Sequence, residues 1–379
     1  MCKAFATSFF CLAMGAITFL WYIHKFSLID DFIIHYYNLC IRCFKWLKCL
    51  EERLGGIKEM KKGKKLVTLL LAGIMALSMT ACGGSTAKYT VGVCQLIQHP
   101  ALDAATKGFE DALKEKLGDE VEIDVQIAQG DSTSCSTITN TFTANNYSLI
   151  MANATAALQA ASSSTANIPI LGTSITDYAT ALDADNWTGV TGKNISGTSD
   201  LAPLDQQAKC IKEIFPDAKK IGILYCSAEA NSKYQADVIS GYLTEMGYTC
   251  EVYTFTDSND ISTVTQSACD GSDLIYVPTD NIVADCTEAI NNVALPAGVP
   301  IFAGEEGICK GCGVATLSID YYDLGYQTGL MAYEILVNGA DPATMEIRFA
   351  PEVTKKYNKA IADELKITIP DGYEAVVTE

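Results

Sequence analysis

Residues 89–117 read YTVGVCQLIQHPALDAATKGFEDALKEKL, an apolar run followed by a stretch of mixed polarity. Tyr89–Leu96 is apolar enough to form a buried β-strand. From Pro100 to Leu117 the apolar residues recur every three or four positions, which is the spacing of one face of an α-helix. A buried strand that leads into an amphipathic helix is typical of a parallel sheet covered by helices. This stretch therefore predicts an α/β fold.

The same alternation continues along the chain in two blocks. Further strands are predicted at Glu122–Gln129, Ser148–Ala154, Ile168–Thr173, Lys219–Cys226, Thr249–Phe255, Leu274–Pro278 and Pro300–Ala303. Helices are predicted at Cys135–Asn145, Thr155–Thr165, Gln206–Phe215, Ala228–Met246, Ile261–Cys269 and Asn281–Val293. A linker near Trp187–Ala202 separates the two blocks. We therefore expect an α/β protein with two doubly wound parallel-sheet lobes.

Charge is distributed unevenly along the chain. The 379 residues carry a net charge of −18, although the first 81 residues are basic. From Cys82 onward there are 16 basic and 40 acidic residues, and Arg348 is the only arginine. Such an acidic surface repels phosphate groups, so we expect no nucleic-acid partner and no binding to anionic lipid headgroups.

Residues 60–81 have the organisation of an export signal peptide. Lysines follow Met60, and 14 uncharged, mostly apolar residues run from Leu66 to Met79. A helix of that length spans about 21 Å, too short for a bilayer core of about 30 Å. Thr80-Ala81-Cys82 resembles a bacterial lipobox. The resemblance implies a lipoprotein with a lipid on Cys82 and a linker at residues 82–87, anchored on the outer face of the bacterial cytoplasmic membrane through its lipid alone.

Residues 1–59 do not fit a signal that begins at Met60. Ala4–Ile23 is uncharged and long enough to cross a membrane. We favour the alternative of a start site assigned too far upstream, because Leu54-Gly55-Gly56 can be encoded by a ribosome-binding tract just before Met60. An N-terminal peptide from residues 1–59, found by mass spectrometry, would contradict that interpretation.

Nine cysteines follow the lipid site. An odd number at irregular spacing gives no disulfide framework, and those inside apolar segments are expected to be small buried residues. Among these nine, Cys309 and Cys312 form the only close pair, either as a loop disulfide or as two thiols. Zinc is not expected, because neither a second pair nor a histidine is nearby. The sequence thus predicts no metal and no other cofactor.

Ligands of open parallel sheets bind beyond the carboxyl ends of the strands. The residues there are mostly small, hydroxyl-bearing or acidic, and we take the following as candidate ligand-binding residues: Gln95, His99, Asn153, Thr155, Ala156, Thr173, Thr176, Asp177, Ser199, Asp200, Glu229, Asn231, Ser232, Asp280, Asn281, Glu305 and Asp320. Many of these residue types also cap helices, and for any single one capping is the commoner role.

Five segments, in order, resemble those of a known family: His99–Ala104, Gly197–Asp200, Glu229–Ser232, Tyr276–Asn281 and Ile319–Gly325. They are similar to segments of ABC-transporter substrate-binding proteins of the tryptophan/tyrosine-uptake type, which have the type I periplasmic-binding fold. The resemblance covers about residues 88–350 and is interrupted at Glu305-Glu306-Gly307 and the cysteine pair that follows.

That resemblance implies two lobes, joined by a hinge of three crossing strands, which close on an aromatic amino acid. The first lobe is expected to comprise residues 88–197 and 321–348, and the second residues 198–320 and 349–379. The implied partners are an ABC permease and its ATPase, docked by acidic patches on the lobe tips, and the protein is expected to be a monomer.

An amino-acid ligand needs an anionic partner for its ammonium and hydrogen-bond donors for its carboxylate. Because the one arginine lies late in the chain, the carboxylate is expected at helix-start N–H groups, at Asn153–Ala156 or Thr173–Thr176. For the ammonium we favour Asp280, assisted by Asp200 or Glu305.

The walls around the ligand side chain should be apolar or aromatic. Tyr178, Tyr225 and Tyr321 are candidates. Tryptophan, tyrosine and phenylalanine stay open as ligands, and nucleosides or sugars are alternatives within the same fold.

Two other classes of function, an enzyme and a ligand-sensing module, have less support in the sequence. Gly130-Asp131-Ser132 superficially resembles the start of an esterase motif, but His99 is the one histidine beyond the signal and no catalytic motif surrounds it. We therefore expect that the protein is not an enzyme. A ligand-sensing module for a kinase or chemoreceptor would use the same fold, but the sequence contains no signalling domain.

Overall fold

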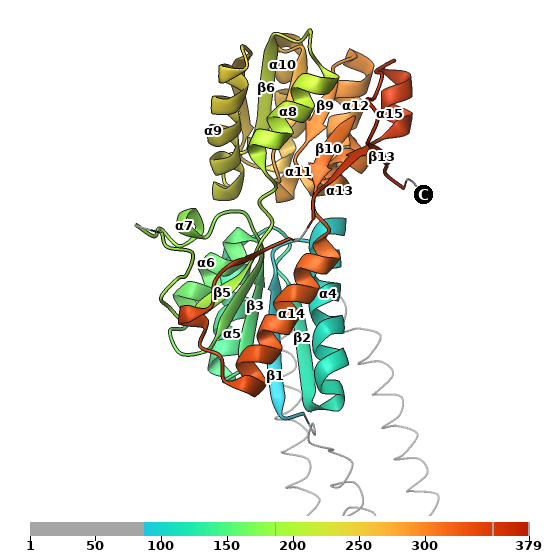
Figure 1. The fold of residues 1–379 in the computed structure, drawn as a ribbon. Coiled ribbons are helices and arrows are strands. Elements are labelled where there is room, and N and C mark those ends of the chain that lie inside the picture. Colours follow the sequence, from blue (N-terminus) through green and yellow to red (C-terminus); the bar gives the residue numbers. More distant parts are fainter. Residues whose placement is uncertain (1–86, 186, 351, 378–379) are drawn as a thin grey trace, which may run out of the picture. The chain divides into compact units, whose positions relative to one another are not determined.

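The computed structural model describes residues 87–185, 187–350 and 352–377. The predicted leader, signal peptide and lipid site lie outside these residues. Two separate sheets, each covered by helices, make up the described part (Figure 1). The predicted α/β fold with two parallel-sheet lobes is therefore confirmed.

The first lobe is built on a six-stranded sheet of order β11-β5-β4-β3-β1-β2, all of whose strand pairs are parallel. Its strands are β1 (Tyr89–Gln95), β2 (Val121–Ile127), β3 (Leu149–Asn153), β4 (Ile170–Ile175), β5 (Ile195–Ser199) and β11 (Arg348–Phe349). Its helices are α4 (Pro100–Leu117), α5 (Ser132–Ala144), α6 (Thr155–Ser164), α7 (Tyr178–Ala181) and α14 (Tyr321–Asn338).

The second lobe is built on a seven-stranded sheet of order β13-β12-β10-β9-β8-β6-β7, in which β12 alone pairs antiparallel, against β10. Its strands are β6 (Lys220–Cys226), β7 (Thr249–Phe255), β8 (Leu274–Val277), β9 (Ile301–Ala303), β10 (Ala315–Ser318), β12 (Thr354–Tyr357) and β13 (Glu374–Ala375). Its helices are α8 (Leu204–Ile214), α9 (Ala230–Glu245), α10 (Ile261–Gly271), α11 (Asn281–Asp285), α12 (Thr287–Ala297), α13 (Glu306–Gly311) and α15 (Lys359–Glu364).

The chain passes between the two sheets three times: after β5, after β10 and after β11. Strand β5 ends at Ser199 and β11 at Phe349, and these two residues pair with each other in the first sheet. The lobe limits predicted at 197 and 348 therefore fall inside strands of the first sheet, slightly before the crossings.

Each sheet has apolar packing on both faces. In the first lobe, Phe109 of α4 and Met331 of α14 pack on one face, and Phe142 of α5 and Leu158 of α6 on the other. Helices α4 and α14 lie side by side along the first sheet (Figure 1). Their backbones approach closely at Gly325, where an added Cβ would overlap the backbone oxygen of Ala105.

The structure corrects the sequence expectation within the predicted linker, because residues 187–202 contain strand β5 (Ile195–Ser199) of the first sheet. The helix predicted over Asn281–Val293 is divided at Cys286 into α11 and α12. Of the two alternatives left open for the close pair, the structure has two buried free thiols at Cys309 and Cys312, and most of the other described cysteines are also buried.

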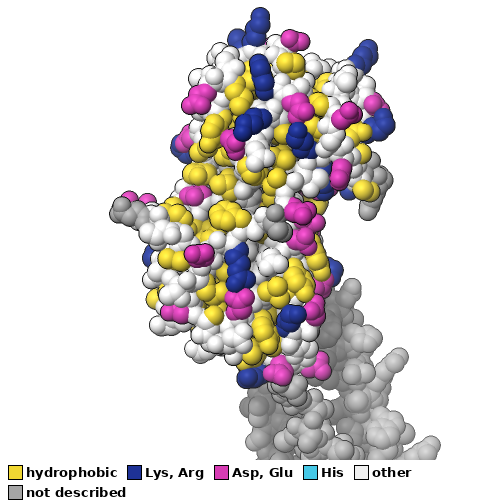
Figure 2. Space-filling model, viewed as in Figure 1, with side chains coloured by type: hydrophobic (Ala, Val, Ile, Leu, Met, Phe, Trp, Pro, Cys, Tyr) yellow, Lys and Arg dark blue, Asp and Glu magenta, His cyan; other side chains and the backbone are white. Residues whose placement is uncertain are grey.

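None of the helices in the described part of the chain combines the length and apolar character that a membrane crossing requires. On the face in Figure 2, basic and acidic side chains are scattered among each other without a continuous basic patch. Within single helices, some basic and acidic side chains form ion pairs, such as Lys107 with Asp111 in α4 and Lys233 with Asp237 in α9.

Candidate functional site

The turns at the carboxyl ends of the two sheets contact each other. His99 follows β1, and its Nε2 lies 3.2 Å from Oδ1 of Asn281, the first residue of α11 in the second lobe. Gln235 of α9 donates to the hydroxyl of Thr176, which follows β4, over 3.4 Å. Ile282 of α11 packs against the core of the first lobe. Most of the predicted ligand-binding residues lie in these turns, so the fold gathers them from distant parts of the sequence.

A row of buried polar side chains crosses the first sheet at its carboxyl edge. Gln95 donates to Asp103 over 2.7 Å and accepts from Thr106 over 2.6 Å. Asn153, on the neighbouring strand, donates to Thr106 over 3.0 Å. Thr173 continues the row through the Thr198 hydroxyl, 3.2 Å away. Gln95 and Thr173 thus bond within the lobe, and we assign them a positioning role.

The start of α6 offers free N–H groups. Its N-cap residue Ala154 makes no side-chain cap, so the first amides of the helix, including those of Thr155 and Ala156, have no side-chain partner there. Ala154 and Ser174 have φ values of 89° and 55°, which non-glycine residues rarely adopt. The Ser174 hydroxyl and Oδ1 of Asn153 are buried without partners among the described residues. Backbone strain and unsatisfied polar groups therefore coincide at this edge.

Four buried carboxylates face the same region: Asp200, Glu229, Asp280 and Glu305. None of them takes part in an ion pair within the described residues. Burial raises the pKa of Asp200 to about 6, of Glu305 to about 7 and of Asp280 to about 8, with the charge of Glu229 adding to the shift at Asp280. Such a group of buried acids is costly unless a cation or protons neutralise it.

Three of the four carboxylates already accept hydrogen bonds from backbone or side-chain amide N–H groups. Glu229 accepts from the Asn281 side chain, from Asn231 and from the backbone N–H groups of Asn281 and Ile282. Asp280 caps α11 through the Val283 N–H, at 2.9 Å, and ties down Cys226 N at 2.8 Å. Glu305 caps α13.

Asp200 differs, because its hydrogen-bond partners are hydroxyl groups. Oδ1 accepts from Thr176 over 3.1 Å and Oδ2 from Tyr321 over 2.9 Å. It is 4% exposed and lies at the first crossing between the lobes. Of the four carboxylates it is the one whose hydrogen bonds come from hydroxyl groups and not from a helix start, which makes it our candidate for a ligand cation.

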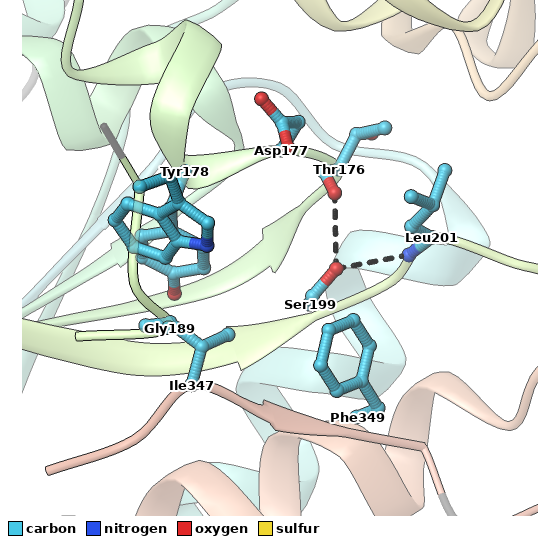
Figure 3. Close-up of a pocket in the computed structure, with 9 residues that line it drawn as sticks. Thr176, Asp177, Tyr178, Gly189, Ser199, Leu201, Ile347 and Phe349 are labelled. Carbon is cyan, nitrogen blue, oxygen red and sulfur yellow. Dashed lines mark hydrogen bonds between the residues drawn. The ribbon is translucent and has the colours of Figure 1, made fainter. Parts of the chain in front are cut away.

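The remaining predicted residues have local roles. Asp177 caps α7 and Asp320, which is exposed, caps α14. Ser199 donates to the Thr176 carbonyl and accepts from Leu201 N (Figure 3). Asn231 and Ser232 lie beside the Thr279 carbonyl, at 3.1 and 3.4 Å.

The three tyrosines proposed as walls are placed differently. Tyr321 donates to Asp200 and so borders the candidate site. Tyr178 donates to carbonyls of the first sheet and stacks on Trp187. Tyr225 is buried in the core of the second lobe. Tyr321 is thus the one of the three that bonds to a candidate carboxylate, and the wall roles of all three tyrosines stay predictions.

A cavity of about 100 Å³ lies beside the crossing strands (Figure 3). Its lining residues are Thr176, Asp177, Tyr178, Trp187, Gly189, Ser199, Leu201, Ile347 and Phe349. All of them come from the first lobe or its first crossing, and one of them, Thr176, also accepts from Gln235 of the second lobe, so this cavity adjoins the contact between the turns of the two lobes.

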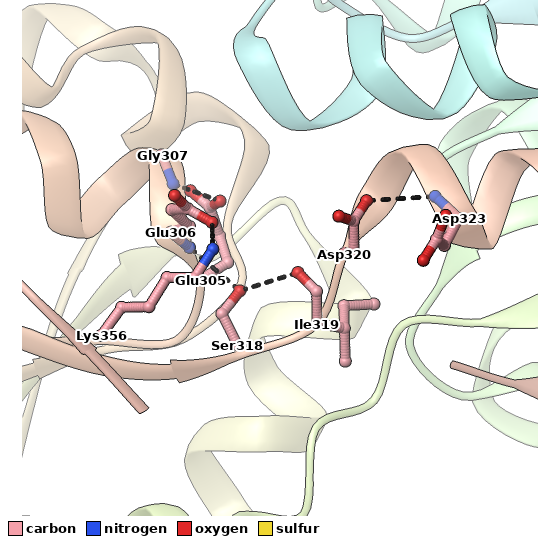
Figure 4. A network of polar contacts seen from close by, with 8 residues as sticks. All are labelled: Glu305, Glu306, Gly307, Ser318, Ile319, Asp320, Asp323 and Lys356. Atoms are coloured by element: carbon pink, nitrogen blue, oxygen red, sulfur yellow. Dashed lines mark hydrogen bonds and ion pairs between the residues drawn. The ribbon is translucent and has the colours of Figure 1, made fainter. Parts of the chain in front are cut away.

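Polar contacts hold the second crossing in place (Figure 4). Ser318 accepts from Glu306 N over 3.1 Å and donates to the Ile319 carbonyl over 3.2 Å. Glu306 also pairs with Lys356. The residue before it, Glu305, is thus positioned next to the hinge.

Sequence reasoning did not name Gln235, and it expected Tyr321 as a wall residue without its hydroxyl contact to Asp200. Gln235 bonds both Thr176 and the backbone of Thr279. Gln235 lies on the buried face of α9, one turn after Asn231. Because a buried glutamine needs hydrogen-bond partners, this position could have predicted its contacts. The hydroxyl of Tyr321 gave no such signal, because only the fold brings it to Asp200.

The raised pKa values predict how the unliganded protein responds to pH. Asp200, Glu305 and Asp280 hold protons in the folded state at pH values where the unfolded chain has lost them. Their contribution to stability is therefore complete below about pH 4 and is lost as pH rises through about 6 to 8. We expect the melting temperature to fall between pH 5 and pH 8.5, and Asp280→Asn to reduce that slope. Scanning calorimetry measures the melting temperatures, with Asp237→Asn, a substitution at an exposed site, as the control. Equal slopes of melting temperature against pH in the wild type and Asp280→Asn would contradict this prediction.

Together, the two sheets, their three connections and the facing polar turns define a two-lobed α/β binding protein for small solutes. Residues 90–378 match the family model described as ABC transporter substrate binding protein, and the chain belongs to that family. It is thus the extracytoplasmic solute-binding component of an ABC transporter, and the predicted family is confirmed.

Relatives agree with this assignment. A tyrosine-binding protein of Clostridioides difficile (strain R20291) is 36% identical over 295 residues, which cover 73% of this chain and 85% of the relative. The crystal structure of an ABC domain in complex with L-Trp from Streptococcus pneumonia is 33% identical with a TM-score of 0.72, and the match covers 76% of this chain and all of that one (100%). The ligand-free, open structure of a substrate-binding protein with adhesive properties from Clostridium difficile is also 33% identical, with a TM-score of 0.60 over 77% of this chain and 100% of that one.

Proposed function

We propose that this protein binds a free aromatic L-amino acid between its lobes and delivers it to an ABC permease. The observation that carries the proposal is Asp200, a buried carboxylate held by two hydroxyl groups and paired with no cation among the described residues. An ammonium group is the ligand function that such a carboxylate binds best.

The start of α6 is suited to bind the carboxylate of the amino-acid ligand. A ligand carboxylate there would meet backbone N–H groups and the positive end of the helix dipole. The Ser174 hydroxyl, which lacks a partner among the described residues, is a further donor at the same edge. Asp200 and the α6 start follow β5 and β3 of one sheet, which lie two positions apart, and we infer that a single α-amino acid contacts both. This arrangement replaces Asp280 by Asp200 as our leading ammonium partner, with Glu305 beside it.

The relatives support an aromatic side chain, since one is named for tyrosine and another was solved with L-Trp. The TM-score to the L-Trp complex, 0.72, exceeds the 0.60 to the ligand-free, open structure at the same 33% identity. The hydrogen bond between His99 and Asn281 also joins the lobes directly. These features support a site that is completed when the lobes close.

Delivery follows from closure. Ligand contacts from both lobes stabilise the closed form, which the permease would recognise through acidic patches on the lobe tips. We infer that the protein acts as a monomer, performs no catalysis and is tethered by a lipid on Cys82.

A ligand screen tests the proposal. We expect L-tryptophan or L-tyrosine to raise the melting temperature of the piece beginning at Lys88, with nucleosides and sugars as controls. A ligand at 100 times its dissociation constant adds about 2.7 kcal/mol to the free energy of unfolding. A shift with nucleosides or sugars but none with aromatic amino acids would contradict the proposal.

Fractionation tests the lipid anchor. We expect the full chain to sediment with membranes and Cys82→Ser to be released into the soluble fraction, because without the thiol no acyl chains can be attached. Cys94→Ser, within β1, is the matched control and should stay membrane-bound. Membrane association of Cys82→Ser equal to the wild type would contradict anchoring through the lipid alone and would point to another segment, such as Ala4–Ile23.

A further inference from the structure

A chain of hydrogen bonds runs from the second lobe to His99 in the first. It begins at Glu229, which accepts from Nδ2 of Asn281 over 2.7 Å and from three other N–H donors. A carboxylate surrounded by N–H groups accepts only, so the amide nitrogen of Asn281 must face Glu229. Oδ1 of Asn281 is therefore directed toward His99.

This orientation determines the tautomer of His99. The amide oxygen of Asn281 can only accept, so the Nε2 atom 3.2 Å away carries a hydrogen. Burial lowers the pKa of His99, which keeps the ring neutral with a single proton. Because that proton is on Nε2, Nδ1 is a bare hydrogen-bond acceptor.

Nδ1 of His99 has no partner among the described residues, although the side chain is only 7% exposed. His99 occupies the N-cap position of α4 but makes no side-chain cap. Capping thus fails to explain the residue, whereas Asp131 and Asp177 do cap the helices that follow them. A buried acceptor without a donor is unfavourable, so a donor supplied by the ligand would stabilise the bound state.

The order of the strands places His99 at the far end of the site from Asp200. β1 lies three positions from β5 in the first sheet, and strands are spaced by about 4.8 Å, so the two strand ends are roughly 14 Å apart. The start of α6 follows β3, which lies between them. An amino acid bound through its ammonium at Asp200 and its carboxylate at α6 therefore lies along the same sheet edge as His99, and we infer that its side chain extends toward that residue.

We propose that His99 determines side-chain specificity by accepting, at Nδ1, a hydrogen bond from the indole N–H of tryptophan or the phenol O–H of tyrosine. This inference rests on the function proposed above. Phenylalanine has no such donor and would leave Nδ1 unpaired. We expect the tighter of L-tyrosine and L-tryptophan to bind at least about 10-fold more strongly than L-phenylalanine.

Two substitutions separate the nitrogen atoms of the ring. In His99→Gln the side-chain amide nitrogen replaces Nε2, which keeps a donor for Asn281 but removes the acceptor at the Nδ1 position. In His99→Asn the side-chain oxygen replaces Nδ1, which keeps the acceptor but removes the link to Asn281. Titration calorimetry with the three amino acids should show the preference reduced to within about 3-fold in His99→Gln. His99→Asn should retain the preference while binding all three more weakly.

A ligand analogue tests the same point without a variant. 4-Fluoro-L-phenylalanine is close to tyrosine in size and has no donor, so the wild-type protein should bind it about as weakly as phenylalanine. Equal binding of phenylalanine and the preferred amino acid, or an unchanged preference in His99→Gln, would overturn the role of His99 and leave the proposed function standing. Failure of all three amino acids to bind the wild type would overturn both.

Discussion

The Asp200→Asn variant should bind an aromatic amino acid about 100-fold more weakly than the wild-type protein. Asp200 is buried and accepts only from the Thr176 and Tyr321 hydroxyls, so the ligand ammonium would be its one cationic partner among the described groups. Removing one member of a buried, hydrogen-bonded charge pair costs about 2–5 kcal/mol, and about 2.7 kcal/mol corresponds to a factor of 100 in the dissociation constant.

The fold should survive this substitution. Asparagine keeps an oxygen that can accept from a hydroxyl, and the unliganded protein no longer buries a charge, so its melting temperature should equal or exceed that of the wild type. Titration calorimetry supplies the affinities. Asp320→Asn is the matched control, because Asp320 also follows a strand at a crossing but is exposed and caps α14, a role asparagine can take over. If Asp200→Asn bound the ligand with wild-type affinity, Asp200 would not be the partner of the ammonium. Glu305 or Asp280 would then be the candidates for that role.

Much of the fold could be predicted because the local pattern and the tertiary structure agree. Buried parallel strands need long apolar runs, and the helices between them need one apolar face. Residue type alone therefore indicates the strand at Tyr89–Leu96 and the helix at Pro100–Leu117. The break of the predicted helix at Cys286 has no comparable signal. It depends on how α11 is held by Asp280 and Glu229.

The location of the site could also be predicted, but the roles of its carboxylates could not. The carboxyl ends of parallel strands converge at one edge, which is why residues following β1, β4 and β8 meet. Asp280 and Asp200 look alike in the sequence, since both follow a strand. Only the structure shows that Asp280 accepts from two backbone N–H groups, whereas Asp200 accepts from two side chains. Capping was the more frequent outcome, as it is for Asp177, Glu305 and Asp320.

The contact between α4 and α14 bears on both ends of the proposed ligand site. Helix α14 begins directly after the second crossing, and its first residue, Tyr321, holds Asp200. The same helix packs along α4, at whose N-terminus His99 stands. Gly108 and Gly325 allow this packing, because an added Cβ at either position would overlap the backbone of the opposite helix. The close approach of the two helices therefore supports both ends of the proposed ligand site.

Gly325→Ala should accordingly lower the free energy of unfolding by about 3 kcal/mol or more. The new methyl group would overlap the carbonyl of Ala105, which is backbone and cannot move aside as a flexible side chain could. The helices must then separate, which opens the packing between Phe109 and Met331 on the sheet below. Chemical unfolding by urea measures the loss. Gly241→Ala is a control with the opposite expected sign: Gly241 is an exposed position inside α9, with nothing within 4 Å of an added Cβ, so alanine should stabilise the helix by about 0.5–1 kcal/mol. Equal stabilities of Gly325→Ala and the wild type would mean that α4 and α14 are not held at this distance in solution.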